Sequence, residues 1–600
     1  MIDVLMVIYR PRLDELAECL EALLRESRLV PGLRVRLRHN DAGPGATSGL
    51  QALYDRVSAA GLALEMASTE GGNIGFGRGM NALMADSKAE FVLVLNQDAI
   101  PEPGSLQVLS ETARSDPADV AAWEMRQIPF EHPKEYDPVT LVTEWVSGAA
   151  VLLRTSAARQ VGGFEPRIFM YGEDVELSWR LRCAGFRLRY IARSAVVHHT
   201  YAVANEVKPL QVLEGIYANL SIRARYSGHR RILQGVSMAC AEMMIPQPFP
   251  GRRKGIAKAL AKFARNYRYF WNSHQSAPGF EPRFAGWGFE LRREGAFHSF
   301  QPMAEQPQDK PLVSILIRTH KRAAFLRQAL TSVLHQTYRD IEVVVVEDGS
   351  DEGRAVCDEF RDRLNVSYHR VFPGRGRSVA GNLALAKARG EWLCFLDDDD
   401  LLFADHVEVL LQTAAEHRVL GAYGLSWRTH TRIVDEKNGV VEEERHEVFP
   451  DEAFSRMVMW HHNFMPIQSV LFHRSLYERH GGFAEDMDQL EDWNLWTRYT
   501  IDADFVQLRK VTSKYRVPAS VQTSAQRQGK LDEAYRDAVA RQDAIEFKAT
   551  PALVRKMAED YAKANALIHV GRDEVRATVA RWPVLRHLFA LRGLARLRRR

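Results

Sequence analysis

The sequence is poor in cysteine and has no long apolar run. Its 600 residues contain five cysteines, none in a Cys-x-x-Cys pair, so a zinc ribbon has no support and a disulfide scaffold is excluded. Sparse, unpaired cysteines are typical of a reducing cytoplasm, where we expect the protein to be located. No stretch of about 18 apolar residues occurs, so the sequence predicts no membrane-spanning helix. The first residues are typical of a β-strand and lack the features of a signal peptide.

The chain also has little surplus of charge. Lysine plus arginine number 80 and aspartate plus glutamate 76, which gives a formal net charge of +4 and does not suggest a dedicated nucleic-acid binder. Apolar residues make up 46% and charged residues 26%, values that exclude a mostly disordered or collagen-like protein. At roughly 150 residues per domain, the length predicts three or four structural units.

Four landmarks occur twice along the chain in the same order. They are an apolar strand, a Gly/Arg/Asn loop, an apolar strand ending in carboxylates, and Gly-Gly-Phe followed by Glu-Asp. Their two copies lie at 3–9 and 313–319, 75–83 and 374–385, 91–98 and 392–400, and 162–174 and 481–492. Ordered repetition of this kind indicates two copies of one module.

Strands alternate with helical patterns in both copies, which predicts an α/β fold with a mostly parallel sheet covered by helices. We expect one module over 1–235 and the other over 311–525. A basic, aromatic linker at 236–310 would join them, and a helical, basic tail would occupy 526–600. Ligands of such sheets bind outside the carboxyl ends of the strands, where the polar landmarks should converge.

The run Asp397–Asp400 places four acids at the end of an apolar strand. Adjacent like charges are costly unless cations or hydrogen-bond donors offset them, and Mg²⁺ with a sugar-nucleotide diphosphate would do so. The alternative is a solvated acidic turn that caps a helix. Asp348, which follows another apolar strand, can accept hydrogen bonds from a base or ribose, or can form an ordinary turn with the Gly-Ser that follows it.

The second module resembles an inverting GT-A glycosyltransferase of family 2. The resemblance is carried by SILIRTHKR, SVLHQTYRDIEVVVVEDGSD, ARGEWLCFLDDDDL and GGF…LEDWNLW, at 314–322, 332–351, 388–401 and 481–496. It implies that Thr319 and Asp348 hold the nucleotide, with Arg377 near the diphosphate. Asp397 and Asp399 would be the ribose and metal carboxylates of a DxD motif, and Arg322 and Asp398 would also contact the donor.

The resemblance makes Asp492 the general base of this module. An inverting transfer needs the acceptor hydroxyl to be aligned behind the anomeric carbon and deprotonated as it attacks, which one carboxylate can do. The pair Glu491-Asp492 can equally cap the helix that follows, and the two roles are compatible. Many relatives carry a histidine after a Tyr-Arg pair near the module end. Tyr515-Arg516 continues here as Val-Pro-Ala-Ser, so metal binding would rest on acids alone.

The first module is similar to the rhamnosyltransferase-like branch of the same family. The matching segments are GGNIGFGRGMNAL, LNQDAIPEPGSL, WVSGAAVLLRTSAARQVGGF, FMYGEDVELSWRLRCAGFRLRY and AVVHH, at 71–83, 95–106, 145–164, 169–190 and 195–199. They imply that Asp98 is a metal carboxylate with Asn96 at the first DxD position, that Asp174 is the base, and that His198 is a further metal ligand. His198 can also be explained by packing at a strand end.

Donor binding in the first module would further involve Asp41 and Arg78. The turn Asn40-Asp41-Ala42-Gly43 departs from the DN(A/G)S-like turn of relatives, and Tyr9-Arg-Pro-Arg12 replaces their Thr-Tyr-Asn. The glycines of GFGRG have a GxGxxG-like spacing, but they lie far from the first strand, which argues against a dinucleotide-binding oxidoreductase.

Two basic segments are free of acids. One runs from Arg252 to about Asn272 with apolar residues at helical spacing, and the other is Trp582–Arg600. Basic amphipathic helices bind anionic membrane surfaces, and peripheral contact with the inner membrane would suit a lipid-linked acceptor. Alternatively, each helix packs its apolar face on a module. Nucleic-acid binding has no recognised module in its favour.

Three hypotheses about function follow. The first is a bifunctional transferase that uses nucleotide-diphospho-sugars and Mg²⁺ or Mn²⁺. Its first module would add a deoxyhexose such as rhamnose from dTDP-rhamnose. The acceptor would be a glycan, a lipid-linked sugar or a protein, and the product an O-antigen, a capsule or a glycosylated surface protein such as flagellin. The second hypothesis is one active module with a degenerate first module that binds acceptor or membrane. The third is a non-catalytic glycan-binding scaffold.

Overall fold

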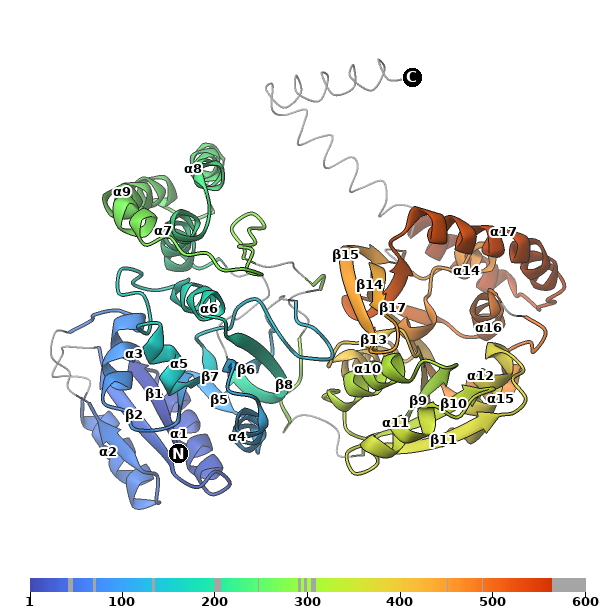
Figure 1. The fold of residues 1–600 in the computed structure, drawn as a ribbon, viewed down its shortest axis with the longest axis horizontal. Coiled ribbons are helices and arrows are strands. Elements are labelled where there is room, and N and C mark those ends of the chain that lie inside the picture. The colour runs from blue at the N-terminus through green and yellow to red at the C-terminus, as the bar shows by residue number, and fades with distance from the viewer. Residues whose placement is uncertain are drawn as a thin grey trace, which may run out of the picture. The chain divides into compact units, whose positions relative to one another are not determined.

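Two α/β units follow one another along the chain in the computed structural model (Figure 1). The first unit comprises Met1–Asp309 and the second begins at Lys310. The structure describes residues 1–40, 47–67, 72–131, 135–198, 207–245, 248–289, 293–295, 299–303, 309–449, 452–487 and 489–563.

The first unit contains an eight-stranded mixed sheet of order β3-β2-β1-β4-β7-β6-β8-β5. Strands β1 to β4 run parallel, and β7 is antiparallel to both β4 and β6. The strands are β1 (Ile2–Ile8), β2 (Leu33–His39), β3 (Leu64–Met66), β4 (Phe91–Leu95), β5 (Ala99–Pro101), β6 (Val120–Ile128), β7 (Ala150–Arg154) and β8 (Arg187–His198). The helices among them are α1 (Leu13–Ser27), α2 (Thr47–Ala59), α3 (Phe76–Ala85), α4 (Ser105–Ser115), α5 (Thr155–Gln160) and α6 (Glu173–Cys183).

The second unit repeats this sheet in the order β11-β10-β9-β12-β16-β14-β17-β13, with β15 added beside β14. Its strands are β9 (Val313–Thr319), β10 (Ile341–Asp348), β11 (Asn365–Val371), β12 (Trp392–Asp397), β13 (Leu401–Leu402), β14 (Gly421–Asp435), β15 (Val440–Phe449), β16 (Val470–His473) and β17 (Phe505–Pro518). The helices are α10 (Ala323–Leu334), α11 (Gly353–Phe360), α12 (Arg377–Lys387), α13 (His406–His417), α14 (Arg456–His461), α15 (Arg474–His480), α16 (Glu491–Tyr499) and α17 (Val521–Asp543).

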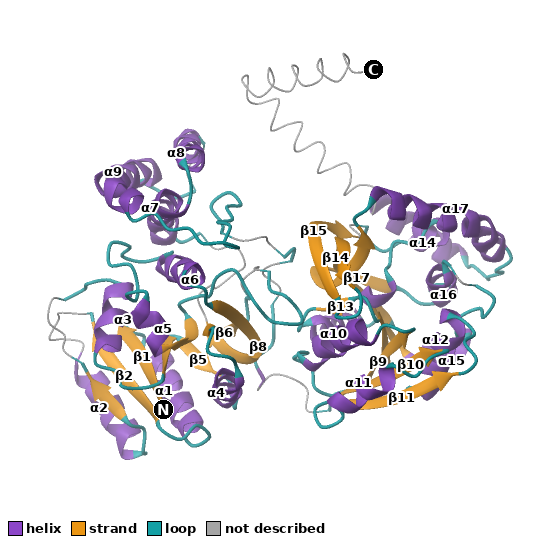
Figure 2. Cartoon of the chain, in the orientation of Figure 1, coloured by secondary structure: helices purple, strands orange, loops and turns teal. Residues whose placement is uncertain are grey.

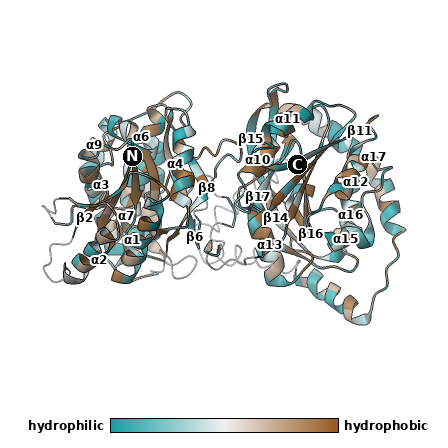
Figure 3. Cartoon of the chain, turned by 90° about the horizontal axis from the view of Figure 1, so that it is seen from below, coloured by the Kyte–Doolittle hydropathy of each residue, from teal (hydrophilic) through white to brown (hydrophobic). Residues whose placement is uncertain are grey.

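The two strand orders are the same when each strand is replaced by its counterpart, so the predicted fold of two tandem α/β modules is confirmed. The central strands β4, β9 and β12 are strongly apolar, and Figure 3 shows hydrophobic residues gathered along the strands of both units. All five residues of β4 are buried and apolar, because helices cover both faces of the parallel part of the sheet. The polar landmarks therefore begin where β4 and β12 leave this core.

The repeated Gly-Gly-Phe landmark has a packing role. Asn81 of α3 accepts a hydrogen bond from the Phe164 backbone N–H at 2.7 Å and donates one to its carbonyl at 2.8 Å. A Cβ at Gly163 would lie 2.3 Å from the Asn81 Oδ1, so only glycine fits. In the second unit Asn382 binds the backbone of Phe483 in the same way beside Gly482.

In both units, an arginine of the next helix binds the backbone around the Gly-Gly-Phe landmark. Arg180 of α6 donates to the carbonyls of Val161 and Gly163, each at 2.6 Å. Arg498 of α16 donates to the carbonyls of His480 and Gly482. These contacts fix α6 and α16, the helices that begin with the two Glu-Asp pairs.

Three helices after β8 complete the first unit: α7 (Pro209–Tyr226), α8 (His229–Met244) and α9 (Arg252–Asn272) (Figure 2). Ile256, Ala259 and Phe263 of α9 are buried against α7 and α8. Helix α7 is tied to α6 by Arg225, which lies 2.5 Å from Glu176 and 2.7 Å from Glu165. The apolar face of α9 is therefore packed inside the unit. Arg253, Lys254 and Lys258 are exposed, whereas Arg252 is buried and pairs with Glu242.

The expected module ends can be compared with the helices. Helix α8 runs through the expected boundary at 235–236, and α17 runs through the one at 525–526. The basic segment Trp582–Arg600 lies outside the described residues. None of the helices in the described part combines the length and the apolar run that a membrane span needs.

Candidate active site

A cavity of about 1220 Å³ opens at the carboxyl ends of β9, β10 and β12 in the second unit. Its walls hold all the donor- and metal-binding residues that the sequence predicted for this unit: Thr319, Arg322, Asp348, Arg377, Asp397, Asp398 and Asp399. These residues come from loops and strand ends far apart in the sequence, as expected for a ligand site in an α/β sheet.

The four consecutive acids alternate in exposure. The side chains of Asp397 and Asp399 are 26% and 39% exposed, whereas that of Asp398 is 6% exposed. Asp400 is buried, and one of its carboxylate oxygens accepts the backbone N–H of Arg516 at 3.1 Å. The first and third acids therefore face the cavity, which is the DxD spacing that the sequence predicted.

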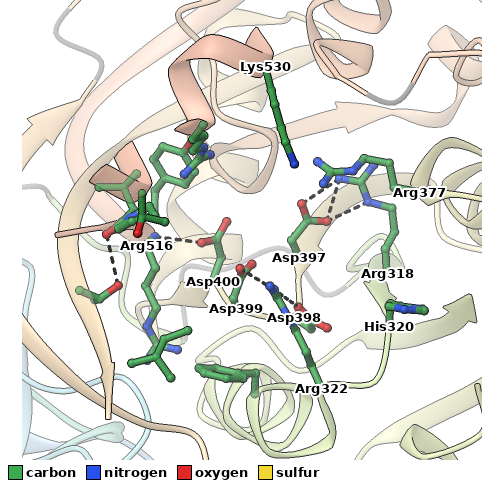
Figure 4. Close-up of a pocket in the computed structure, with 18 of the residues that line it drawn as sticks. Arg318, His320, Arg322, Arg377, Asp397, Asp398, Asp399, Asp400, Arg516 and Lys530 are labelled. Carbon is green, nitrogen blue, oxygen red and sulfur yellow. Dashed lines mark hydrogen bonds and ion pairs between the residues drawn. The ribbon is translucent and has the colours of Figure 1, made fainter. Parts of the chain in front are cut away.

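Arginines balance two of these acids. Arg318, on the strand beside β12, donates to both carboxylate oxygens of Asp397 at 2.8 Å and to Glu491 at 3.0 Å (Figure 4). Arg322 lies 2.8 Å from an oxygen of Asp399. Arg318 was not among the predicted site residues, although it directly precedes Thr319 and its strand register pairs it with Asp397.

The two inward acids hold their protons more tightly than usual. Burial and the charge of Asp399 raise the pKa of Asp398 to about 7, even though it accepts a hydrogen bond from the Thr319 hydroxyl at 2.7 Å. Burial and the charges of Asp399 and Asp397 raise the pKa of Asp400 well above its ordinary value. Because burial penalises the charged form, the run carries less negative charge than its four carboxyls suggest.

Asp348 fixes the loop that leads into α12. Its two carboxylate oxygens accept the backbone N–H groups of Arg375 at 2.7 Å and Gly376 at 3.0 Å. Arg377 follows as the first residue of α12, with its guanidinium 3.8 Å from Glu491 and half exposed to the cavity. Asp348 therefore positions Arg377 through the backbone, a link that the sequence did not indicate.

Asp492, the predicted base, lies behind the lining of the cavity. Its Oδ2 accepts a hydrogen bond from Asn463 Nδ2 at 2.9 Å, and its Oδ1 accepts the Trp493 N–H at 2.8 Å. Burial and the charge of Glu491 raise its pKa to about 7. Tyr515, which lines the cavity, is close enough to Asp492 to be affected by its charge. A carboxyl with this pKa can take up a proton near neutral pH.

Several cations of the cavity were missed by the sequence reasoning. Arg516 ends the Tyr-Arg pair that the sequence singled out, while Arg527 and Lys530 belong to α17. The sequence places the segment after 525 in a tail separate from the module, so it does not predict Arg527 and Lys530 as site residues. The sequence did contain one indication: Arg527 and Lys530 are three residues apart, so they lie on the same face of a helix.

In the first unit the structure brings Asp98 and His198 together. His198 Nε2 lies 3.5 Å from Asp98 Oδ1, and its Nδ1 lies 2.8 Å from Gln127 Oε1. Gln127 Oε1 can only accept, so Nδ1 donates to it and the ring is fixed. Burial opposes ionisation of Asp98, but His198 and Lys208 outweigh it and hold the pKa of this carboxyl below its ordinary value.

The other predicted residues of the first unit are dispersed. Asp174 Oδ2 accepts the Gly148 N–H at 3.0 Å, and its Oδ1 accepts the Val175 N–H at 2.8 Å. Asn96 follows β4 directly, and its backbone N–H bonds to Ala149. Arg78 Nε donates to the carbonyl of Pro166 at 2.7 Å, on the exposed side of α3. Asp41 lies outside the described residues.

The two units differ in the groups around the Glu-Asp pair. When the strand registers are extended and the helix starts are aligned, the first unit has Val7, Asn96 and Phe76 where the second has Arg318, Asp397 and Arg377. Glu173, the counterpart of Glu491, is buried, and its Oε2 has no hydrogen-bond partner among the described residues. Burial and the charge of Asp174 raise the pKa of Glu173 to about 8.

Comparison with known proteins bears on the second unit. Residues 314–481 match the family described as Glycosyl transferase family 2. This part of the second unit is therefore similar to family 2 glycosyltransferases. This match covers the strands and loops that carry Thr319, Asp348, Arg377 and the acidic run, and it ends at Gly481, before Asp492.

Curated relatives carry related names. An uncharacterized glycosyltransferase of Rickettsia conorii is 26% identical over 225 residues, which are 37% of this chain and 35% of the relative. The glycosyltransferase GlyA of Streptococcus pneumoniae is 32% identical over 113 residues, 19% of this chain and 16% of the relative. The chain thus spans about a third of the length of the relative from Rickettsia conorii.

Two solved structures show a local likeness to this chain. One is S. aureus TarS 1–349 in complex with UDP-GlcNAc, with 18% identity, a TM-score of 0.30, and coverage of 36% of this chain and 61% of that one. The other is the mannosyltransferase PcManGT from Pyrobaculum calidifontis in complex with GDP-Man and Mn²⁺. It has 16% identity, a TM-score of 0.30, and coverage of 45% of this chain and 83% of that one.

The oxygen-rich site of the second unit fits a divalent cation of the Mg²⁺ or Mn²⁺ type. Asp399 is the most exposed acid of the run, and it forms an ion pair with Arg322. In the first unit, His198 bonds through Nδ1 to Gln127 and turns Nε2 toward Asp98. A nitrogen and a carboxylate facing each other in this way are suitable ligands for such a cation.

Proposed function

We propose that the chain is a bifunctional inverting glycosyltransferase that uses nucleotide-diphospho-sugars. The observation that carries this proposal is the cavity of the second unit, where Asp348, Arg377 and the alternating Asp397 and Asp399 meet in front of the half-buried Asp492. Such a site can bind an anionic donor with a divalent cation and can accept the proton of an attacking hydroxyl.

Each residue of the second unit then has a defined task. Thr319, Asp348 and Asp397 hold the nucleotide part of the donor, with Arg322 and Asp398 as supporting contacts. Arg377 faces the diphosphate. Asp399 binds the divalent cation, which neutralises charge on the diphosphate as it leaves. Asp492 is the general base, and Asn463 orients its carboxylate.

The first unit is proposed to be a second, rhamnosyltransferase-like transferase. Asp174 would be its base, Asp98 and His198 its cation ligands, and Asn96, Arg78 and Asp41 part of its donor site. The proximity of Asp98 and His198 supports their role, and the two backbone N–H groups that hold the half-buried Asp174 carboxylate support that of Asp174. Its donor is proposed to be a deoxyhexose nucleotide such as dTDP-rhamnose.

The acceptor is proposed to be a growing bacterial surface glycan, such as an O-antigen or capsule, carried on a lipid, or else a surface protein. Transfer would take place at the cytoplasmic face of the inner membrane. The packed apolar face of α9 excludes insertion of that face, so α9 would contribute only charge to membrane contact. Arg253, Lys254 and Lys258 are exposed on it.

The test is a donor screen on the full chain with the variants Asp174→Asn and Asp492→Asn. Release of nucleoside diphosphate would be followed across UDP-, GDP- and dTDP-sugars with Mn²⁺ or Mg²⁺. We expect each variant to lose transfer from one donor and keep the other. Full activity in both variants would contradict the assigned bases, and no release by the wild type with any donor would favour a glycan-binding scaffold.

A second candidate is a single active unit, the second. It is favoured by Val7, Asn96 and Phe76, which remove from the first unit the ionic contacts that surround Asp397 and Glu491. The first unit would then bind the acceptor or the membrane. In the same screen, Asp174→Asn would leave every transfer unchanged and Asp492→Asn would abolish all of them.

A further inference from the structure

One wall of the cavity in the second unit is formed by the end of β17 and the first half of α17. Residues at a spacing of three to four on α17 face the cavity: Thr523, Gln526, Arg527, Lys530 and Glu533. Arg516 lines the same wall from β17. Figure 4 shows Lys530 extending from its helix toward Asp397 and Arg377.

The cations of this wall differ from the other arginines of the cavity. Arg318, Arg322, Arg377 and Arg432 each form an ion pair with a carboxylate. In the described part of the chain, Arg516, Arg527 and Lys530 form none. Arg516 lies over the ring of Phe325 at 5.8 Å, with Nε and Nη1 buried and without hydrogen-bond partners among the described residues.

Arg527 has a single neutral partner. Its Nη2 donates to the Tyr515 hydroxyl at 2.5 Å, and its guanidinium lies 5.5 Å from the centre of the same ring. Three positive charges thus face one cavity, with Glu533 as the only acid that α17 adds to its lining in the described residues. Cations held in this way bind a multiply charged anion, and phosphate oxygens are suited to arginine and lysine donors.

We propose that Arg516, Arg527 and Lys530 bind the diphosphate of the donor and stabilise it as the leaving group. This inference rests on the proposed function of the second unit. The three cations lie where β17 ends and α17 begins. At this point the sequence lacks the histidine that many relatives carry after a Tyr-Arg pair. In the transfer, the bond from the acceptor oxygen to the anomeric carbon forms as the bond to the diphosphate oxygen breaks. The electron pair of the broken bond passes to that oxygen, and the hydroxyl proton passes to Asp492.

The second half of α17 links this wall to the helix of the base. Tyr535 stacks on Trp493 of α16 with ring centres 5.6 Å apart, and Gln542 Nε2 donates to Thr497 Oγ1 at 2.7 Å. Ala538 is buried in the core of the unit. The helix that carries Arg527 and Lys530 is thus anchored on the helix that begins with Glu491-Asp492.

The test measures binding, so it does not depend on finding the acceptor. Titration calorimetry on the full chain would compare UDP, GDP and dTDP with the corresponding nucleosides, in EDTA and in Mg²⁺. The variants are Lys530→Ala, Arg527→Ala, the double variant and Lys530→Arg. Arg536→Ala is the matched control, because Arg536 is exposed on the same helix and does not line the cavity. Circular dichroism would check that α17 stays folded.

We expect each single alanine variant to weaken nucleoside diphosphate binding about 10-fold in EDTA and the double variant about 100-fold, because charge-assisted contacts are lost. Nucleoside binding should not change, and Lys530→Arg should restore most of the affinity. Unchanged diphosphate affinity in the double variant would overturn this inference and leave the proposed function standing. If the wild type binds no nucleoside diphosphate, both fall.

Discussion

Arg318 and Asp397 form a two-pronged ion pair on neighbouring strands, with both oxygens of the carboxylate 2.8 Å from the guanidinium. Arg318 also lies 3.0 Å from Glu491. One buried cation thus forms ion pairs with two acids, Asp397 at the end of β12 and Glu491 at the start of α16. The first unit has Val7 and Asn96 at the corresponding positions, and Glu173 in place of Glu491. The cation and the acid of the ion pair are thus replaced together.

We expect Arg318→Val to destabilise the second unit by about 3 kcal/mol, because it leaves the nearly buried Glu491 with only the more distant Arg377. The triple variant Arg318→Val, Asp397→Asn, Glu491→Gln copies the neutral arrangement of the first unit and should recover most of that loss. Urea unfolding, followed through the transition of the second unit, would give the free energy of unfolding of the single and the triple variant. A triple variant as unstable as the single one would show that charge balance is not the cause.

The pKa of Asp492 predicts how activity depends on pH. A base must be ionised to accept a proton, so kcat/KM of the second transfer should rise with pH up to about 7 and then level off. Asn463→Ala should move this midpoint upward, because the amide stabilises the ionised form. Asp492→Asn should lower kcat by about 10²–10⁴-fold without changing donor affinity. A flat profile between pH 5.5 and 8.5 would contradict the base assignment.

Glu173 predicts a pH-dependent stability in the first unit. Its pKa is higher in the folded chain, about 8, than the ordinary 4.5, so its protonated form is favoured by folding. The stability that this provides is complete below about pH 4.5 and is lost as pH rises toward 8. Glu173→Gln should therefore match the wild type in Tm at pH 5 and exceed it at pH 9. The exposed Glu18→Gln is the control and should show no such divergence.

Asp98 and His198 predict a cation site in the first unit. Mn²⁺ bound to the full chain in the presence of nucleoside diphosphates, counted by electron paramagnetic resonance, should fall from two ions to one in Asp98→Asn or His198→Ala. Asp399→Asn should remove the other ion. Gln127→Ala should weaken the first site about 10-fold or more, because Gln127 orients the ring of His198. Unchanged stoichiometry in Asp98→Asn would exclude this ligand.

The sequence predicted the two-module α/β fold and brought Thr319, Asp348, Arg377 and the acidic run into one site. It could do so because these residues follow apolar strands, and strand ends converge in a parallel sheet. It missed Arg318, whose polar group lies inside a strand and becomes visible only through the register with Asp397. It also missed Arg527 and Lys530, since an exposed helix does not show in sequence which cavity it borders.

In both units, a helix after the last strand places a tyrosine on a tryptophan of the helix that begins with the Glu-Asp pair. Tyr226 lies 5.3 Å from Trp179, and Tyr535 lies 5.6 Å from Trp493. A gene fusion or an exchange of the two repeats that cuts directly after β8 or β17 would separate each repeat from this partner. A repeat that is exchanged as a unit should therefore end or begin near Asp309 and Lys310, so that it keeps the helices that follow its last strand.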